Sequence, residues 1–199
     1  IPLRLVGSEM CIRDRAGITA YDQAQISASG NTISGAESGS GIAIRSSIAT
    51  LENNIVGPIG GYNGLWIYGT SDVVAIGNTF SDTARESVVH GEYHYQDSGW
   101  PSIQPSESRL YMENNIISNN SGTCSSQKMY GGEFQCPAIH IFRSSATLYN
   151  NTVTDSVGDA LRIKGGIVNV QGNVMQTESF GVNISCLLYT SDAADEEDS

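Results

Sequence analysis

The sequence is poor in basic residues and in long apolar runs, and each shortage excludes a class of protein. Only 10 of its 199 residues are Lys or Arg against 21 Asp or Glu, so the formal net charge is −11. Nucleic-acid binding needs a basic face, and we therefore expect no nucleic-acid partner. No apolar stretch approaches the roughly 20 residues that cross a bilayer, so we expect no membrane span.

What the sequence has instead is an eight-position repeat: apolar, any, apolar, any, Gly or Asn, Asn, any, apolar. The six copies are residues 26–33, 49–56, 73–80, 110–117, 146–153 and 168–175. Each copy has Asn at its sixth position: Asn31, Asn54, Asn78, Asn115, Asn151 and Asn173. Alternating apolar positions predict a β-strand with one buried face. The Gly or Asn that follows predicts a tight corner with positive φ, and the last apolar position begins a second strand.

A third apolar pair follows each second strand and predicts a third strand. The pairs are Ile42/Ile44, Leu65/Ile67, Ile139/Ile141 and Leu161/Ile163. The short Asn-to-Asn spacings are 22 to 24 residues, and the two long ones, 36 and 37, each add one loop. Each spacing then corresponds to one coil of a solenoid, stacked on the next at about 4.8 Å. We expect the stacked Asn side chains to form a hydrogen-bonded ladder.

These motifs resemble the right-handed parallel β-helix repeat proteins, the pectate-lyase-like superfold. The resemblance covers residues 16–185 and implies an all-β, right-handed parallel β-helix of about six three-strand coils. Leucine-rich repeats fit less well because residues 16–185 contain only five Leu and little helix-forming sequence. Left-handed hexapeptide helices and propellers need different periods.

The two ends do not share the six-copy pattern. Val6–Arg15 and Cys186–Ser199 resemble translated sequencing-adapter read-through, so we expect residues 1–15 and the acidic tail 186–199 to be non-native. Genuine capping segments are the alternative. Residues 16–185 then form one domain, a fragment of a longer protein, with insertions at 91–108 and 121–137.

Residues 16–185 contain one pair of cysteines, Cys124 and Cys136, which bracket the second insertion. We expect a local disulfide, with two free thiols as the alternative. A disulfide indicates an oxidising compartment, and we expect an extracellular, cell-surface or periplasmic protein. Three N-x-S/T sequons, at Asn119, Asn150 and Asn183, agree with this weakly.

Function is expected on the outward side of the third strands, between the two insertions. The register predicts outward columns that contain Trp66, Tyr68, His90, Glu92, His140, Phe142, Arg162 and Lys164. Aromatic faces and hydrogen-bonding groups along a groove suit a sugar chain, and the family resemblance implies a substrate groove over this kind of sheet. The alternative is that these side chains only cover the flank of the solenoid.

A metal site is a second hypothesis, based on His90, Glu92 and His94. In an extended strand these three side chains project to one side, and two imidazoles with a carboxylate can bind zinc or another transition metal. A loop at Gly91 would make them diverge. We expect no cofactor; neither calcium nor a transition metal has further support.

Arg162-Ile163-Lys164 and His90-Gly91 resemble the RIK and His-Gly motifs of polygalacturonases. The paired aspartate motifs of that family are missing, and so are the Arg and His motifs of pectate lyases. Asp155 and Asp159 are the best remaining carboxylates, with solvent-exposed turn residues as the simpler interpretation. Catalysis needs a positioned acid and base, so no catalytic residue is predicted.

We therefore expect a monomeric, polysaccharide-binding or structural repeat module that binds a cell-surface glycan. The alternative is a polysaccharide lyase, epimerase or hydrolase with its catalytic coils partly outside this fragment. An adhesin or phage fibre is a third alternative and would need evidence of trimerisation.

Overall fold

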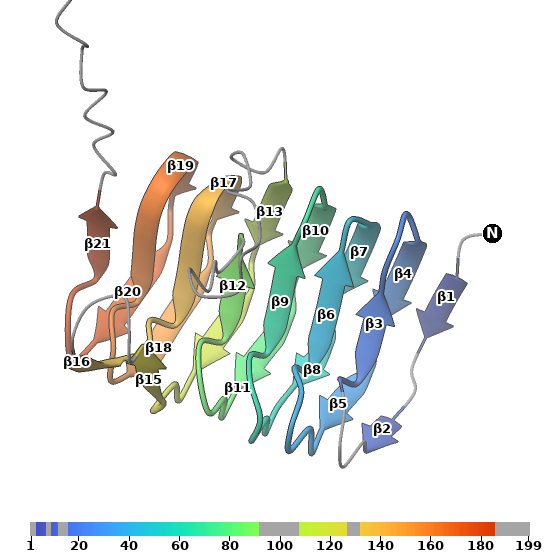
Figure 1. Ribbon diagram of the computed structural model, residues 1–199, viewed down its shortest axis with the longest axis horizontal. Helices are drawn as coiled ribbons and strands as arrows, with labels where there is room; N and C mark the ends of the chain where they lie inside the picture. The colour runs from blue at the N-terminus through green and yellow to red at the C-terminus, as the bar shows by residue number, and fades with distance from the viewer. Residues whose placement is uncertain (1–2, 7–8, 12–15, 92–107, 127–131, 186–199) are drawn as a thin grey trace, which may run out of the picture.

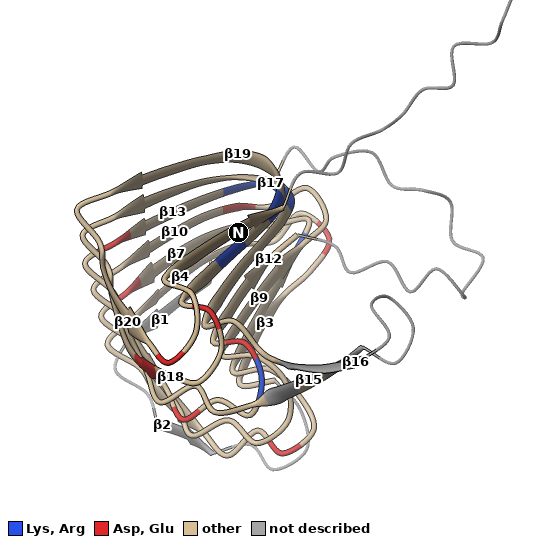
Figure 2. Cartoon of the chain, turned by 90° about the vertical axis from the view of Figure 1, so that its left-hand side faces the viewer, with Lys and Arg blue, Asp and Glu red and all other residues tan. Residues whose placement is uncertain are grey.

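The chain folds into a stack of coils, each made of three short β-strands (Figure 1). The computed structural model describes residues 3–6, 9–11, 16–91, 108–126 and 132–185. Seen along the stack, every coil has three sides, so the strands form three parallel sheets (Figure 2). Within the described residues there is no helix that could cross a membrane.

Each side of the stack is one parallel sheet, and the sheets are numbered by the order of their strands within a repeat. Sheet 1 contains β1 (Leu3–Val6), β4 (Gln25–Ser29), β7 (Ile48–Glu52), β10 (Asp72–Ile76) and β13 (Arg109–Glu113). Sheet 2 contains β2 (Glu9–Cys11), β5 (Thr32–Ser34), β8 (Ile55–Val56), β11 (Thr79–Ser81), β14 (Ile116–Ser118), β18 (Thr152–Ser156) and β20 (Val174–Thr177). Sheet 3 contains β3 (Ile18–Ala20), β6 (Ile42–Arg45), β9 (Leu65–Tyr68), β12 (Val88–His90) and β21 (Val182–Ser185).

Two long strands, β17 (Ile139–Tyr149) and β19 (Leu161–Gln171), pass through both sheet 3 and sheet 1. They turn the corner without a break because Arg143, Gly165 and Gly166 have φ of 48°, 72° and 100°. Sheets 1 and 3 are therefore joined at this end of the stack into one 12-stranded sheet.

The predicted corners after the first strands have the expected backbone. Asn53, Asn114 and Asn150 have φ between 52° and 54°. The equivalent Gly30, Gly77 and Gly172 lie between 65° and 68°. The alternating apolar residues of all three sheets point inward and form one continuous core, in which Phe80, Leu51 and Met112 are fully buried.

The six repeat asparagines form a ladder along the corner between sheets 1 and 2. Each of the first five Asn side chains donates from Nδ2 to the Oδ1 of the next Asn, as from Asn54 to Asn78 at 2.9 Å. The same Oδ1 accepts the backbone N–H of Asn54 at 2.9 Å. Asn78 Nδ2 also donates to the Leu51 carbonyl of the preceding coil at 2.9 Å. The buried amides thus satisfy one another, as buried polar groups must.

A second, shorter ladder lies at the corner between sheets 3 and 1. Its members are Ser47, Ser71, Ser108 and Ser144, each no more than 3% exposed. Each hydroxyl donates to a carbonyl of the chain, as Ser71 Oγ does to Tyr68 at 2.8 Å. The signal was present in the sequence, because these serines stand two residues before the first apolar position in four of the six copies.

Residues 3–6 and 9–11 continue the backbone register of the repeat. Leu3 pairs with Ile26, Leu5 with Ala28 and Met10 with Ile33. The expectation that the N-terminal end does not share the repeat pattern is wrong for residues 3–6 and 9–11. Residues 3–10 differ from the repeat only at the Asn position, where Ser8 stands. The proposed non-native origin of 1–15 and 186–199 stays a prediction, and 186–199 lie outside the described residues.

The second insertion forms an antiparallel hairpin of β15 (Thr123–Ser126) and β16 (Gly132–Gln135). It projects from the coils on the side of sheet 3 (Figure 2). Cys124 and Cys136 form a disulfide at its base, with Cα atoms 5.0 Å apart. Of the first insertion, residues 92–107 lie outside the described part of the chain.

Candidate functional site

The outward face of sheet 3 is the candidate site, and the strand register defines its columns. The first column contains Thr19, Ala43, Trp66, Val89, His140, Arg162 and Asn183. The second contains Arg45, Tyr68, Phe142, Lys164 and Ser185. Six of the eight predicted site residues therefore lie on this face, and the other two are His90 and Glu92.

An aromatic pair lies on β9. The rings of Trp66 and Tyr68 stack with centroids 4.2 Å apart and planes 20° from parallel. The Arg45 guanidinium lies 5.9 Å from the Tyr68 ring centroid. Burial and the neighbouring Tyr21 raise the pKa of Tyr68 to about 12, so its hydroxyl remains protonated at neutral pH. Both rings of the pair are partly accessible to solvent.

His90 faces the core, contrary to the sequence-based prediction. Its Cα partners are Ile67 and Ile141, and it is fully buried. A shift of one residue along a strand moves a side chain to the other face, and Val89 holds the predicted outward position. The sequence contains a signal for the inward position of His90. In the 22- to 24-residue coils the inward apolar residue that corresponds to His90 follows the ladder Asn by 12 or 13 residues, and His90 follows Asn78 by 12.

The buried His90 is neutral and hydrogen-bonded within the serine ladder. Its Nε2 lies 2.8 Å from Ser108 Oγ. Because the Ser108 hydroxyl donates to the Ser71 carbonyl at 2.9 Å, it accepts from His90 Nε2–H. Desolvation lowers the pKa of His90 to about 4. His90 therefore belongs to the core.

The predicted His90, Glu92 and His94 metal site is not available in this form, because His90 faces inward. Glu92 and His94 lie outside the described residues.

The structure brings together a different polar group. His140 Nδ1 lies 3.7 Å from Glu86 Oε1, and both side chains are almost completely buried. Asn63 Nδ2 donates to the other Glu86 oxygen at 3.0 Å.

A second cluster with a buried carboxylate surrounds Asp159 at the end of the same face. Arg162 donates to Asp159 Oδ2 from Nε at 2.8 Å and lies 2.6 Å from it through the terminal nitrogen. Ser179 and Asn183 donate to the same carboxylate at 2.9 and 3.0 Å. Desolvation raises the pKa of Asp159, but these hydrogen bonds outweigh it and leave the pKa below its usual value. Asp159 is therefore a buried, paired carboxylate, and the interpretation of it as an exposed turn residue is wrong.

Glu86 was not singled out from the sequence, although a signal exists. Asn63, Glu86 and Asp159 each stand two residues before a strand of sheet 3. These three residues form a column on three coils, and their amide or carboxylate side chains can hydrogen-bond or bind cations. The other predicted carboxylate, Asp155, is exposed and has φ of 53°, as expected of a turn residue.

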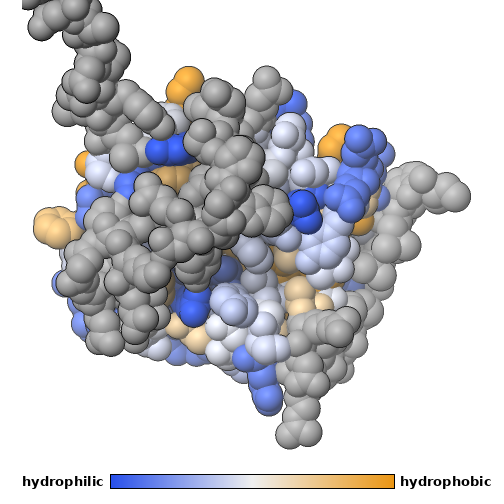
Figure 3. All heavy atoms as spheres, in the orientation of Figure 1, coloured by the Kyte–Doolittle hydropathy of each residue, from blue (hydrophilic) through white to orange (hydrophobic). Residues whose placement is uncertain are grey.

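Phe142 and Lys164 complete the second column. Lys164 Nζ lies 5.6 Å from the Phe142 ring centroid, and Arg143 lies 5.3 Å from it. Burial lowers the pKa of Lys164. Figure 3 shows the described part of this side of the molecule as a mixture of hydrophilic and intermediate side chains with small apolar areas.

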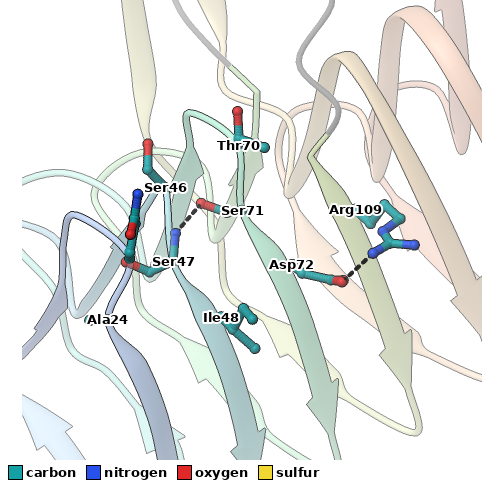
Figure 4. Close-up of a pocket in the computed structure, with 9 residues that line it drawn as sticks. Ala24, Ser46, Ser47, Ile48, Thr70, Ser71, Asp72 and Arg109 are labelled. Carbon is teal, nitrogen blue, oxygen red and sulfur yellow. Dashed lines mark hydrogen bonds and ion pairs between the residues drawn. The ribbon is translucent and has the colours of Figure 1, made fainter. Parts of the chain in front are cut away.

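A separate groove of about 620 Å³ lies at the corner between sheets 3 and 1 (Figure 4). Its lining includes Ser47 and Ser71 of the serine ladder and the exposed Ile48. The ion pair between Asp72 and Arg109, 2.6 Å long, crosses its rim. Sequence reasoning assigned no ligand to this groove.

The stacked coils with parallel sheets and an asparagine ladder agree with the comparison with known families. A family model described as "Right handed beta helix region" matches residues 11–176. The chain belongs to this right-handed β-helix family. No curated protein and no solved structure matches this β-helix. The predicted all-β, right-handed parallel β-helix is therefore confirmed.

Proposed function

We propose that this β-helix binds a polysaccharide on the outward face of sheet 3. The observation that carries the proposal is the stacked pair of Trp66 and Tyr68, which is partly exposed on a flat parallel sheet. Aromatic rings offer a large, rigid apolar surface with polar edges, which suits the C–H face and hydroxyls of a sugar ring. Thr19 and Arg45, on the two preceding coils, are exposed on the same face and continue the accessible surface.

The charges on the face favour an acidic sugar chain. Arg45 is exposed and Lys164 is half-buried beside the Phe142 ring, and both stand in the same column as Tyr68. Arg162 contributes less than the sequence suggested, because its guanidinium is already bound to Asp159. We therefore assign the recognition of carboxylate groups to Arg45 and Lys164.

A binding role is favoured over catalysis on this face. Glu86 and Asp159, 4% and 2% exposed, are the buried carboxylates of the described face, and both already accept hydrogen bonds from neighbouring side chains. A general acid must reach the glycosidic oxygen directly or through one water. Neither buried carboxylate is available for this role, which favours binding over the lyase, epimerase or hydrolase alternative.

The protein is proposed to act outside the cell or at its surface. The Cys124–Cys136 disulfide supports this, because disulfides persist in oxidising compartments. A monomeric module of a longer chain is the assembly we expect. The sugar specificity is the property that binding measurements would define.

The test is calorimetric titration of the full chain with a neutral and an acidic oligosaccharide series, compared with the Trp66→Ala variant. We expect binding to the acidic series and a loss of about 5-fold in affinity for Trp66→Ala, since a ring-face contact contributes on the order of 1 kcal/mol. Trp66 is a sharper probe than His140, because His140 is 5% exposed and its removal would disturb the packing.

The matched control is Tyr111→Ala, which removes an outward aromatic side chain from sheet 1. This variant should bind as the unmodified chain does. Equal losses in both variants, or no binding to any polysaccharide on a glycan array, would contradict the proposal.

A further inference from the structure

A carboxylate lies beside the disulfide at the base of the hairpin. One Glu86 oxygen and the Sγ atoms of Cys124 and Cys136 all lie within 4.8 Å of one another. Glu86 is 4% exposed and Cys136 is fully buried, whereas Cys124 is partly exposed, so the group lies at the edge of the core. In a tetrahedral zinc site with bonds of about 2.0–2.3 Å, the ligand atoms are about 3.5–3.8 Å apart. After the sulfur–sulfur bond opens, rotation of the two cysteine side chains would have to separate the Sγ atoms to give the three donors these spacings.

The backbone holds these donors in place without the disulfide. Asn120, which is fully buried, donates from Nδ2 to the Arg85 carbonyl at 2.7 Å and to the Pro137 carbonyl at 3.4 Å. These two residues are the chain neighbours of Glu86 and Cys136. The Cys136 N–H donates to the Gly122 carbonyl at 3.0 Å. Opening of the sulfur–sulfur bond would leave both segments anchored.

The packing around Gly122 adds a steric constraint. A Cβ atom at this position would lie 1.8 Å from the Ala84 carbonyl oxygen, so the start of the hairpin touches the preceding coil wall directly. At Gly158 a Cβ would lie 2.1 Å from the Cys136 carbonyl oxygen. The segments that carry the two sulfurs are therefore packed against coils on both sides.

We propose that the reduced protein binds a zinc-class divalent cation through Cys124, Cys136 and Glu86. In the oxidised protein the sulfurs are bonded to each other and the group is a structural cross-link. When a dithiol or phosphine reductant opens it, two electrons and two protons convert the disulfide to two thiols, and the reductant is oxidised. Binding of the cation then displaces both thiol protons and gives two thiolate–metal bonds.

Electrostatics favour a dication at this point. Two thiolates and the Glu86 carboxylate would place three negative charges in a largely buried volume, which is unfavourable without a partner. A divalent ion reduces this net charge to −1. The cation would hold the hairpin beside sheet 3 as the disulfide does in the oxidised protein.

The test is titration of the reduced full chain with Co²⁺ as a spectroscopic substitute for Zn²⁺. Cys11→Ser and Cys186→Ser are introduced first, so that the only thiols come from Cys124 and Cys136. We expect one Co²⁺ per chain, with a thiolate-to-cobalt charge-transfer band and tetrahedral d–d bands, displaced by Zn²⁺. The oxidised form of the same protein should give neither band.

Two variants assign the ligands. Cys124→Ser removes one of the two thiolates, so the intensity of the thiolate-to-cobalt charge-transfer band should fall below that of a two-thiolate site. Glu86→Gln should weaken Co²⁺ binding by at least about 10-fold. Asp159→Asn is the matched control, because it removes a buried carboxylate from the same column two coils away. Absence of the bands in the reduced protein, or equal affinity in Glu86→Gln and Asp159→Asn, would overturn the proposal. Circular dichroism of each variant separates loss of metal from loss of fold.

Discussion

The polar side chains inside the coils and those on the outer face of sheet 3 follow different rules. Inside, the same residue type recurs from coil to coil: Asn at the corner between sheets 1 and 2, and Ser at the corner between sheets 3 and 1. Outside, each coil presents a different residue, such as Ala43, Trp66, Val89 and His140 in one column.

This difference separates the residues that stack the coils from those available for recognition. An inward amide must bond to the same group above and below it, because water cannot replace a lost partner. An outward residue has no such requirement, so its identity is free to follow a ligand. Substitutions inside should therefore lower stability, and substitutions outside should change binding.

The largest effect is expected for Asn78→Ala, which breaks the ladder in its middle. The variant leaves the N–H and Nδ2 of Asn54 without their shared acceptor and the Leu51 carbonyl without its donor. Orphaned buried polar groups cost about 1–3 kcal/mol each, so we expect the free energy of unfolding to fall by about 4 kcal/mol. Urea denaturation measures this change.

Asn173→Ala is the matched control at the end of the ladder. Asn173 makes the same bonds to Asn151, but it is only partly buried, so water can replace them. We expect a loss of about 1 kcal/mol. Equal losses at Asn78 and Asn173 would show that ladder position and burial do not matter.

The same distinction explains what the sequence could predict. The repeat has a strict register, so the strands, corners and Asn ladder could be read from residues such as Asn53, Gly77 and Asn78. The residues of the outer face could be assigned only from that register. A register error of one residue placed His90 there in place of Val89. Asn63, Cys124 and Cys136 meet Glu86 from 23 to 50 positions away in the chain, and no local pattern reports such contacts.

The next effect is a pH dependence from His90, the titratable side chain that the sequence placed outside. Its pKa is about 4 in the folded protein against an ordinary 6.5, because burial disfavours the imidazolium. The unfolded chain therefore binds the proton first as the pH falls. Stability from this group is complete above pH 6.5 and is lost progressively down to about pH 4, by up to about 3 kcal/mol.

The measurement is urea denaturation across this pH range for the unmodified chain and for His90→Gln. Gln does not titrate, and its amide can still donate to Ser108, so its curve should lose the histidine component. All other titrating groups are shared, and the difference between the two curves isolates His90. Parallel curves would contradict the inward, desolvated position.

The smallest effect is expected for the Asp72–Arg109 ion pair on the rim of the groove. This pair and the Asp159–Arg162 pair have the same closest N–O distance, 2.6 Å, but their exposure differs. The side chains of Arg109 and Asp72 are 72% and 43% exposed, whereas those of Arg162 and Asp159 are 21% and 2% exposed. Water and salt screen the exposed charges, so a double-mutant cycle with Asp72→Ala and Arg109→Ala should give a coupling energy below about 0.5 kcal/mol.

The corresponding cycle at Asp159 and Arg162 should give a coupling energy on the order of 2 kcal/mol, because burial leaves the remaining charge poorly solvated. Similar coupling energies in the two cycles would mean that distance, rather than burial, sets the strength of polar contacts in this β-helix.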